Sequence, residues 1–103
     1  MSSEDLEQKI IAQLKTVYDP EIPVDVYELG LIYEINFPSE DEVEIVMTLT
    51  SPNCPAAEHL PREVEEKVKA LEQVGKVTVR ITFDPPWSRD MMSEEAQLEL
   101  GLL

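Results

Sequence analysis

The sequence contains one cysteine, Cys54, and it is short of positive charge. A single thiol excludes an internal disulfide bond and cannot by itself supply a four-thiolate metal site. Only 8 Lys and Arg residues oppose 22 Asp and Glu residues, so the formal net charge is −14 over 103 residues. This charge argues against nucleic acid and against an anionic membrane surface, because both ligands require clustered cations. A protein partner, a cation or simple solubility remain as reasons for the acidity.

Long apolar runs are also absent. No stretch approaches the ~20 apolar residues of a membrane-spanning helix. Residues 1–5 are acidic and lack the basic and apolar regions of a secretion signal, so we expect a cytoplasmic protein. The apolar fraction of 43% is typical of a folded chain rather than a disordered one. With no repeat and no linker, residues 1–103 are expected to form one domain.

Apolar periodicity in the first half of the chain predicts a helix followed by a hairpin. Helical spacing over residues 4–17 places four apolar side chains on one face: Leu6, Ile10, Leu14 and Val17. Alternation predicts strands over residues 31–37 and 42–50, joined by a turn at residues 38–41. On the first strand the residues expected on the buried face are Leu31, Tyr33, Ile35 and Phe37.

The second half of the chain predicts a helix, a strand and a short C-terminal helix. The helix carries an apolar stripe ending near Leu71, with Gly75 placed for its C-cap. The strand covers residues 76–83, with Phe83 among its inward residues, and Ser93 is placed to cap the last helix. The predicted fold is therefore an α+β, two-layer domain of order α-β-β-α-β plus a short helix. A mixed three-stranded sheet with helices on one face would bury every apolar stripe.

Cys54 is the sharpest candidate functional residue. It lies between Pro52 and Pro55, after a predicted strand and at the expected start of a helix. The N–H groups at a helix N-terminus favour the thiolate, which attacks electrophiles and coordinates soft metals. The alternative is a small buried apolar residue. Glu58 and His59 follow closely, but neither spacing is typical of a metal site.

Three other sets of residues carry weaker signals. Asp19 and Glu21 flank Pro20, and they either bind a cation or act as acid and base, or simply cap and solvate the end of the first helix. Thr48 and Thr50 lie opposite the apolar set of their strand, where they either contact a ligand or face solvent. Trp87 is either packed structure or, if exposed, an anchor for a protein partner.

Four sequence blocks resemble the SufT/PaaD-type family. They are DPEIPV at residues 19–24, ELGLIY at 28–33, MTLTSPNC at 47–54 and FDPPWSRDMMS at 83–93. The blocks stand in matching order over nearly the whole chain, and the family's helix, hairpin, helix and strand agree with the predicted elements. The resemblance implies a factor for iron-sulfur protein maturation, with Cys54 as its functional residue. It also implies that Asp19, Pro20, Glu21 and Asp84, Pro85, Pro86, Trp87 flank the cysteine loop as site architecture.

Two departures bear on which branch the chain resembles. SufT proteins usually follow the cysteine with a glycine-rich run, whereas this sequence has PAAE at residues 55–58, which is similar to PaaD, an accessory protein of phenylacetyl-CoA oxygenation. PaaD proteins carry a cysteine-rich C-terminal extension, and this sequence stops at Leu103 with a tail similar to SufT. The weight of the resemblance falls on SufT.

The expected cargo is a transient iron-sulfur cluster or iron, and no cluster is expected to be held stably by one chain. A cluster bound through Cys54 needs further ligands from a second copy of the chain, a small thiol or a partner protein. Expected partners are iron-sulfur assembly or client proteins, and a homodimer would bring two thiols together. The alternatives are a PaaD-like accessory role, a purely protein-binding adaptor anchored by Trp87 and Met91, and a cysteine-based transfer enzyme using His59 or Glu58 as base.

Overall fold

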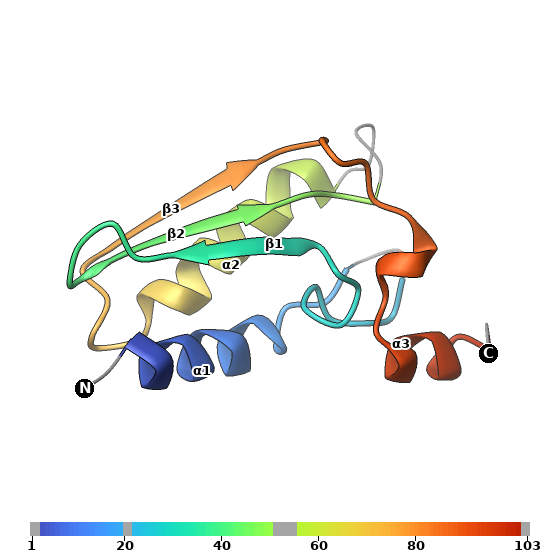
Figure 1. Ribbon diagram of the computed structural model, residues 1–103, viewed down its shortest axis with the longest axis horizontal. Helices are drawn as coiled ribbons and strands as arrows, with labels where there is room; N and C mark the ends of the chain where they lie inside the picture. The colour runs from blue at the N-terminus through green and yellow to red at the C-terminus, as the bar shows by residue number, and fades with distance from the viewer. Residues whose placement is uncertain (1–2, 20–21, 51–55, 102–103) are drawn as a thin grey trace.

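The structure is a computed structural model that describes residues 3–19, 22–50 and 56–101. Its elements follow the predicted order (Figure 1). They are α1 (Ser3–Leu14), β1 (Ile32–Asn36), β2 (Glu42–Met47), α2 (Ala56–Lys69), β3 (Lys76–Ile81), the short 3-10 helix η1 (Arg89–Met91) and α3 (Glu94–Glu99). The α-β-β-α-β order with a C-terminal helix is confirmed, and η1 is an addition to it.

The three strands form one mixed sheet in the order β1-β2-β3. β1 runs antiparallel to β2, and β3 runs parallel to β2. Both α1 and α2 cover the same face of this sheet (Figure 1), and the Gln13 Nε2 amide on α1 donates a hydrogen bond of 2.8 Å to the Lys67 carbonyl on α2. The predicted two-layer architecture is therefore confirmed.

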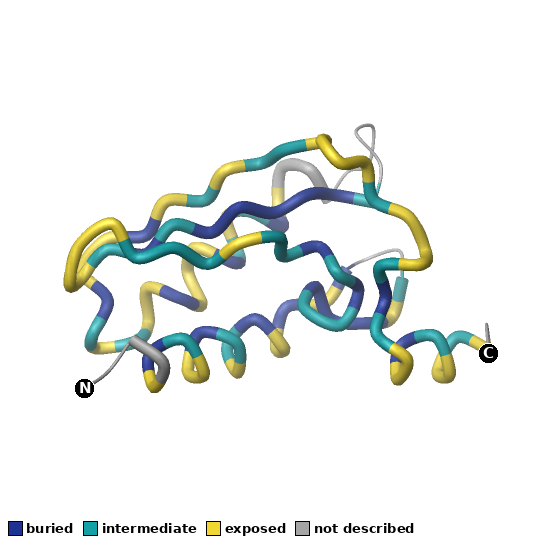
Figure 2. Tube along the Cα trace, viewed as in Figure 1, coloured by how far each residue is buried: buried dark blue, intermediate teal, exposed yellow. Residues whose placement is uncertain are grey.

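The core lies between the sheet and these two helices (Figure 2). The predicted stripe of the first helix is buried along its whole length, from Leu6 through Ile10 and Leu14 to Val17, although α1 itself ends at Leu14. The stripe of α2 packs opposite through Leu60, Val64 and Val68. Each such side chain contributes about 1.5–3 kcal/mol when fully removed from water, so these stripes hold the helices against the sheet.

Tyr33 departs from the predicted alternation. The register slips between Ile32, which pairs with Met47, and Glu34, which pairs with Val46. Such a bulge inserts one extra residue, re-aims its side chain and bends the strand. Tyr33 therefore lies on the sheet face away from the helices, where it lines a pocket with Val46 and Arg80, and its assignment to the core was wrong.

Two expectations near β3 were also wrong. α2 ends at Lys69, so Gly75 is not its C-cap; the Gly75 amide instead donates to the Asp41 carbonyl at 2.7 Å, tying the start of β3 to the hairpin turn. Phe83 was expected to face inward, but β3 ends at Ile81 and the Phe83 side chain is 45% exposed. Among the described residues, no helix is long and apolar enough to cross a membrane.

Candidate functional site

The parallel pairing of β2 and β3 brings two important segments to one end of the sheet. The chain after Met47 leads toward Cys54, and the chain after Ile81 leads into the Asp84–Trp87 block. The Thr82 amide donates to the Met47 carbonyl at 2.9 Å, so the two segments leave the sheet side by side (Figure 1). The carboxyl ends of parallel strands are a common place for ligand sites, because loops diverge there and leave a crevice.

A series of backbone hydrogen bonds adds the first loop of the chain to the same end. The Thr48 amide donates to Leu31, the Leu31 amide to Val26 and the Val26 amide to Val17, at 2.8, 3.1 and 2.8 Å. The described parts of the four sequence blocks therefore meet at this end of the molecule, although they are far apart in the sequence.

Residues 84–93 are held directly against the turn at residues 26–30. The Trp87 Nε1–H group donates to the Leu29 carbonyl at 2.7 Å, and the Ser93 amide donates to the Glu28 carbonyl at 2.9 Å. Tyr33 completes the attachment, because its hydroxyl donates to the Pro85 carbonyl at 2.7 Å. The Asp84–Pro85 peptide bond within this segment is cis. The Trp87 side chain packs partly buried against the core, which favours its interpretation as structure over that of an exposed partner anchor.

Gly30 permits the close approach of these two segments. Its φ of +79° lies in the left-handed region that glycine adopts at little cost. A Cβ atom here would overlap the Met91 carbonyl oxygen and lie 2.9 Å from its carbonyl carbon. The Leu29-Gly30 pair is therefore a structural requirement of the contact with η1.

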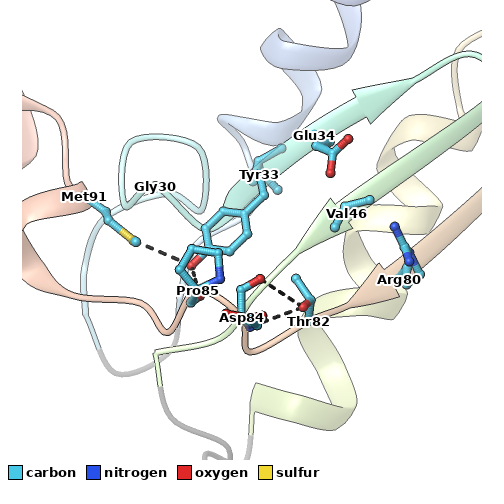
Figure 3. Close-up of a pocket in the computed structure, with 10 residues that line it drawn as sticks. Gly30, Tyr33, Glu34, Val46, Arg80, Thr82, Asp84, Pro85 and Met91 are labelled. Atoms are coloured by element: carbon cyan, nitrogen blue, oxygen red, sulfur yellow. Dashed lines mark hydrogen bonds between the residues drawn. The ribbon is translucent and has the colours of Figure 1, made fainter.

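A pocket of about 650 Å³ opens beside this contact, on the sheet face away from the helices (Figure 3). Val46 is only 3% exposed beneath it, and the Tyr33 ring and Pro85 form one side. Arg80, Glu34 and Asp84 supply the charged side chains of its lining. The size falls within the range of small-molecule sites, about 300–1,000 Å³.

Thr48 and Thr50 differ in their surroundings. Thr48 is fully buried, so a solvent-facing role is wrong for it, and its Oγ1 has no hydrogen-bond partner within the described ranges. A buried hydroxyl without a partner costs about 1–3 kcal/mol, so polar burial at this position needs a reason. Thr50 is half-buried, at the last described position before Cys54.

Asp19 does not solvate or cap the end of α1. It follows Leu14 by five positions, is 4% exposed, and its Oδ1 accepts a hydrogen bond of 3.1 Å from the Ile22 amide. Asp25 behaves in the same way, with Oδ2 accepting from the Glu28 amide at 3.0 Å. Both carboxylates therefore organise the loop between α1 and β1.

Several predicted site residues lie outside the described residues, namely Pro20, Glu21, Cys54 and Pro55. Ala56, the first residue of α2, follows Cys54 by two positions in the sequence. Glu58 belongs to the first turn of α2, and His59 beside it is exposed. In the portion of the chain that is described, no group of three or more His, Cys, Asp or Glu side chains is arranged to hold a metal ion.

The sequence pattern of the family described as iron-sulfur cluster assembly protein matches residues 7–81 of this chain. The chain belongs to this family. A Porphyromonas gingivalis protein named Fe-S protein maturation auxiliary factor is 53% identical over 97 residues, covering 94% of this chain and 92% of that protein. The SufT maturation factor of Staphylococcus aureus is 36% identical and covers 84% of this chain and 98% of its own length.

The fold is also found in solved structures of similar proteins. A Bacillus anthracis domain of unknown function, DUF59, superposes with a TM-score of 0.90 at 35% identity, over 97% of this chain and 95% of that one. The expected PaaD-like resemblance is also confirmed, because a protein of Escherichia coli named as a putative component of 1,2-phenylacetyl-CoA epoxidase is 34% identical. The match covers 89% of this chain but only 55% of that protein.

Sequence reasoning missed two contributors to this end of the family fold. Tyr33 was assigned to the core, because alternation alone carries no signal for a bulge. Gly30 belongs to the ELGLIY block at residues 28–33, but the resemblance to the family implied no particular role for it. Its position directly before a strand was the available signal, since an isolated glycine there often marks a close backbone approach.

Proposed function

We propose that the protein is an auxiliary factor in the maturation of cytosolic iron-sulfur proteins, in which Cys54 contacts a cluster, iron or a cluster-bearing partner. The observation that carries the proposal is the parallel pairing of β2 and β3. It directs the chain that leads to Cys54 and the Asp84–Trp87 segment out of the same end of the sheet. Membership in the iron-sulfur cluster assembly family and the names of the relatives support the same role.

The number of thiols determines how a cluster would be held. Iron-sulfur clusters are usually held by four ligands, and this chain has one cysteine. The remaining ligands must come from a second copy, a small thiol or a partner. Such incomplete ligation favours transfer over storage, because an incoming client can supply ligands that the donor lacks.

The start of α2 supports a reactive thiol at position 54. Helix N-termini carry unpaired N–H groups and a partial positive charge, and both stabilise a thiolate within the first turn. α2 begins two positions after Cys54 in the sequence, and we propose that this helix end favours the thiolate form of the cysteine. The thiolate is the form that binds iron.

Anaerobic reconstitution with iron and sulfide tests the proposal. Wild-type protein is compared with Cys54→Ser and with Ser39→Ala, a control substitution in the hairpin turn at the other end of the sheet. We expect wild type and Ser39→Ala to show visible absorbance, to bind iron and to transfer a cluster to an apo-ferredoxin. Cys54→Ser should lose all three properties. Circular dichroism establishes that all three chains are folded.

Equal iron binding and equal transfer by wild type and Cys54→Ser would show the cysteine mechanism to be wrong. Sedimentation of the loaded wild type separates the sources of the missing ligands. A dimer that forms only with iron supports sharing between two chains, whereas a loaded monomer supports small thiols.

A further inference from the structure

A second hollow, of about 350 Å³, lies between the loop that precedes β1 and the C-terminal helix α3. We call it the α3 hollow. Its lining includes Tyr18, Asp25 and Glu28 from the loop, and Glu95, Leu98 and Glu99 from α3. Figure 1 shows α3 at the same end of the molecule as this loop. The Ser93 amide, which bonds to the Glu28 carbonyl at 2.9 Å, fixes the two walls relative to each other.

Exposed apolar side chains line this hollow. Tyr18 is 57% exposed and Leu98 is 61% exposed, and the described part of the chain has only one other large apolar side chain so exposed, Phe83. Two such side chains around one hollow differ from the scattered apolar residues of an ordinary surface, and aromatic anchors with aliphatic neighbours are typical of protein interfaces.

Every charged side chain among the described lining residues is acidic. Four carboxylates contribute to the lining, and none of its described residues is Lys or Arg; the four are Asp25, Glu28, Glu95 and Glu99. Lys15 pairs with Glu28 at 3.7 Å, which leaves a clear excess of negative charge. Glu99 lies in the last turn of α3, where a carboxylate is unfavourable beside the negative helix end. A cation held in the hollow would relieve this repulsion.

The charge distribution selects the occupant. A second copy of the chain carries a net charge of −14 and is repelled, as are nucleic acid and anionic lipid. A metal ion is disfavoured, because no three or more His, Cys, Asp or Glu side chains of the described residues are arranged to hold one. We propose that the α3 hollow binds a segment of a partner protein that combines Lys or Arg residues with a large apolar side chain.

This docking surface goes beyond the proposed function and does not depend on it. Among the described residues, the hollow's lining comes from the loop that precedes β1 and from α3. Binding of a cationic segment to these residues needs neither a thiol nor iron. The apolar side chain would pack between Tyr18 and Leu98 while the cations meet the surrounding carboxylates. The charges would set the association rate and its dependence on salt.

The probe is a short fluorescent peptide in which lysines alternate with leucines, measured by anisotropy and by amide chemical shifts at low salt. Its controls replace every lysine by glutamate or every leucine by serine. We expect saturable binding with shifts concentrated in residues 18–28 and 94–99, and affinity at least about tenfold weaker for both control peptides. Absence of binding, or shifts concentrated elsewhere, would overturn the proposal.

Matched variants localise the interaction. The double variant Glu95→Gln/Glu99→Gln should weaken binding about fivefold, since each exposed ion pair contributes a fraction of a kcal/mol. The variant Glu65→Gln/Glu66→Gln removes the same charge from exposed positions on α2 and should change affinity less than about twofold. If both double variants weakened peptide binding equally, the net charge of the protein would explain the loss of affinity, and the assignment of binding to the α3 hollow would be wrong.

Apolar variants test the other half of the recognition. Leu98→Ala should weaken binding about fivefold or more through lost apolar burial, whereas Phe83→Ala, at the third exposed apolar position, should not. Cys54→Ser should bind the peptide like wild type. Failure of the docking surface and failure of the cysteine mechanism are therefore distinguishable, because each is measured in an assay that the other does not affect.

Discussion

At the scale of single residues, Gly30 combines two constraints that no side chain satisfies together. Its backbone is left-handed, with φ +79°, and the backbone of Met91 occupies the space where a Cβ would project. Gly101 has nearly the same φ, +74°, but its added Cβ would meet no atom of a described residue within 4 Å, its chain neighbours aside. Comparing the two glycines therefore separates the conformational cost of a positive φ from the cost of steric overlap.

We expect Gly30→Ala to lower the free energy of unfolding by about 2–4 kcal/mol, combining the left-handed penalty with displacement of η1. Gly101→Ala should cost about 1 kcal/mol or less, because it incurs only the first of these penalties, at a position near the end of the chain. Urea denaturation followed by circular dichroism measures both. Equal costs for the two variants would contradict the steric role assigned to Met91.

At the scale of elements, residues 84–93 act as a strap across one end of the sheet. Hydrogen bonds attach this strap to the turn and to β1, and their donors are Trp87, Ser93 and Tyr33. The strap has little regular structure of its own, apart from η1. Its order therefore depends on these tertiary contacts.

Trp87→Phe should keep much of the packing while removing the Nε1–H donor to Leu29. We expect a loss of about 1–3 kcal/mol in stability and faster hydrogen exchange at the Ser93 amide, because the strap opens locally before the sheet does. Amide hydrogen exchange in the central strand β2 should become faster only by the amount that the loss of global stability explains. Unchanged exchange at Ser93 would show that Trp87 does not hold the strap.

Tyr33→Phe provides an independent test at the same scale. It removes the hydroxyl that donates to Pro85 and should cost about 1 kcal/mol, whereas Tyr18→Phe, at an exposed position, should be neutral. Thermal unfolding compares the two variants. If Tyr33→Phe left the melting temperature unchanged, the bulge would position the Tyr33 ring for packing alone and not for the hydrogen bond to Pro85.

The elements were largely predictable from sequence because their apolar stripes repeat with helical or strand periods. Leu6, Ile10 and Leu14 on α1, and Leu60, Val64 and Val68 on α2, needed only periodicity to be assigned. The bulge at Tyr33 and the strap were not predictable in this way. They depend on contacts between residues distant in the sequence, such as Tyr33 and Pro85, and local patterns carry no information about such pairs.

The candidate site was predictable in its parts and not in its assembly. The family resemblance pointed to the segments around Asp19, Thr50 and Trp87 as parts of the site. That these segments lie at the same end of the sheet depends on which strands pair parallel and which antiparallel, and apolar periodicity does not determine this. The burial of Asp19 and Thr48 was equally hidden, since polar residues are expected at the surface unless tertiary contacts enclose them.

At the scale of the whole molecule, net charge opposes folding. The excess of 14 negative charges brings like charges together when the chain becomes compact. Lys15 pairs with Glu28 at 3.7 Å, but 22 Asp and Glu residues face only 8 Lys and Arg residues, so favourable pairing can offset only part of this repulsion. Stability should therefore depend on ionic strength.

Raising the salt concentration from about 0.01 M to about 0.15 M shortens the Debye length from about 30 Å to about 8 Å and should raise the melting temperature by several degrees. A variant with four carboxylates on and after α2 neutralised, the half-buried Glu63→Gln and the exposed Glu65→Gln, Glu66→Gln and Glu72→Gln, should show a smaller rise. Scanning calorimetry measures both dependences. A melting temperature that falls with salt would show that attractive pairs dominate.

The attachment of the strap to the turn sets an order of events during protein synthesis. Leu29 and Trp87 are 58 positions apart, and Tyr33 and Pro85 are 52 apart. A ribosome that has just added Cys54 has not yet made the segment that holds this end of the molecule together. At about 5–20 residues per second, the nascent chain carries its only thiol for seconds before the strap exists. The complete end of the sheet is thus available to partners only after translation has passed Ser93.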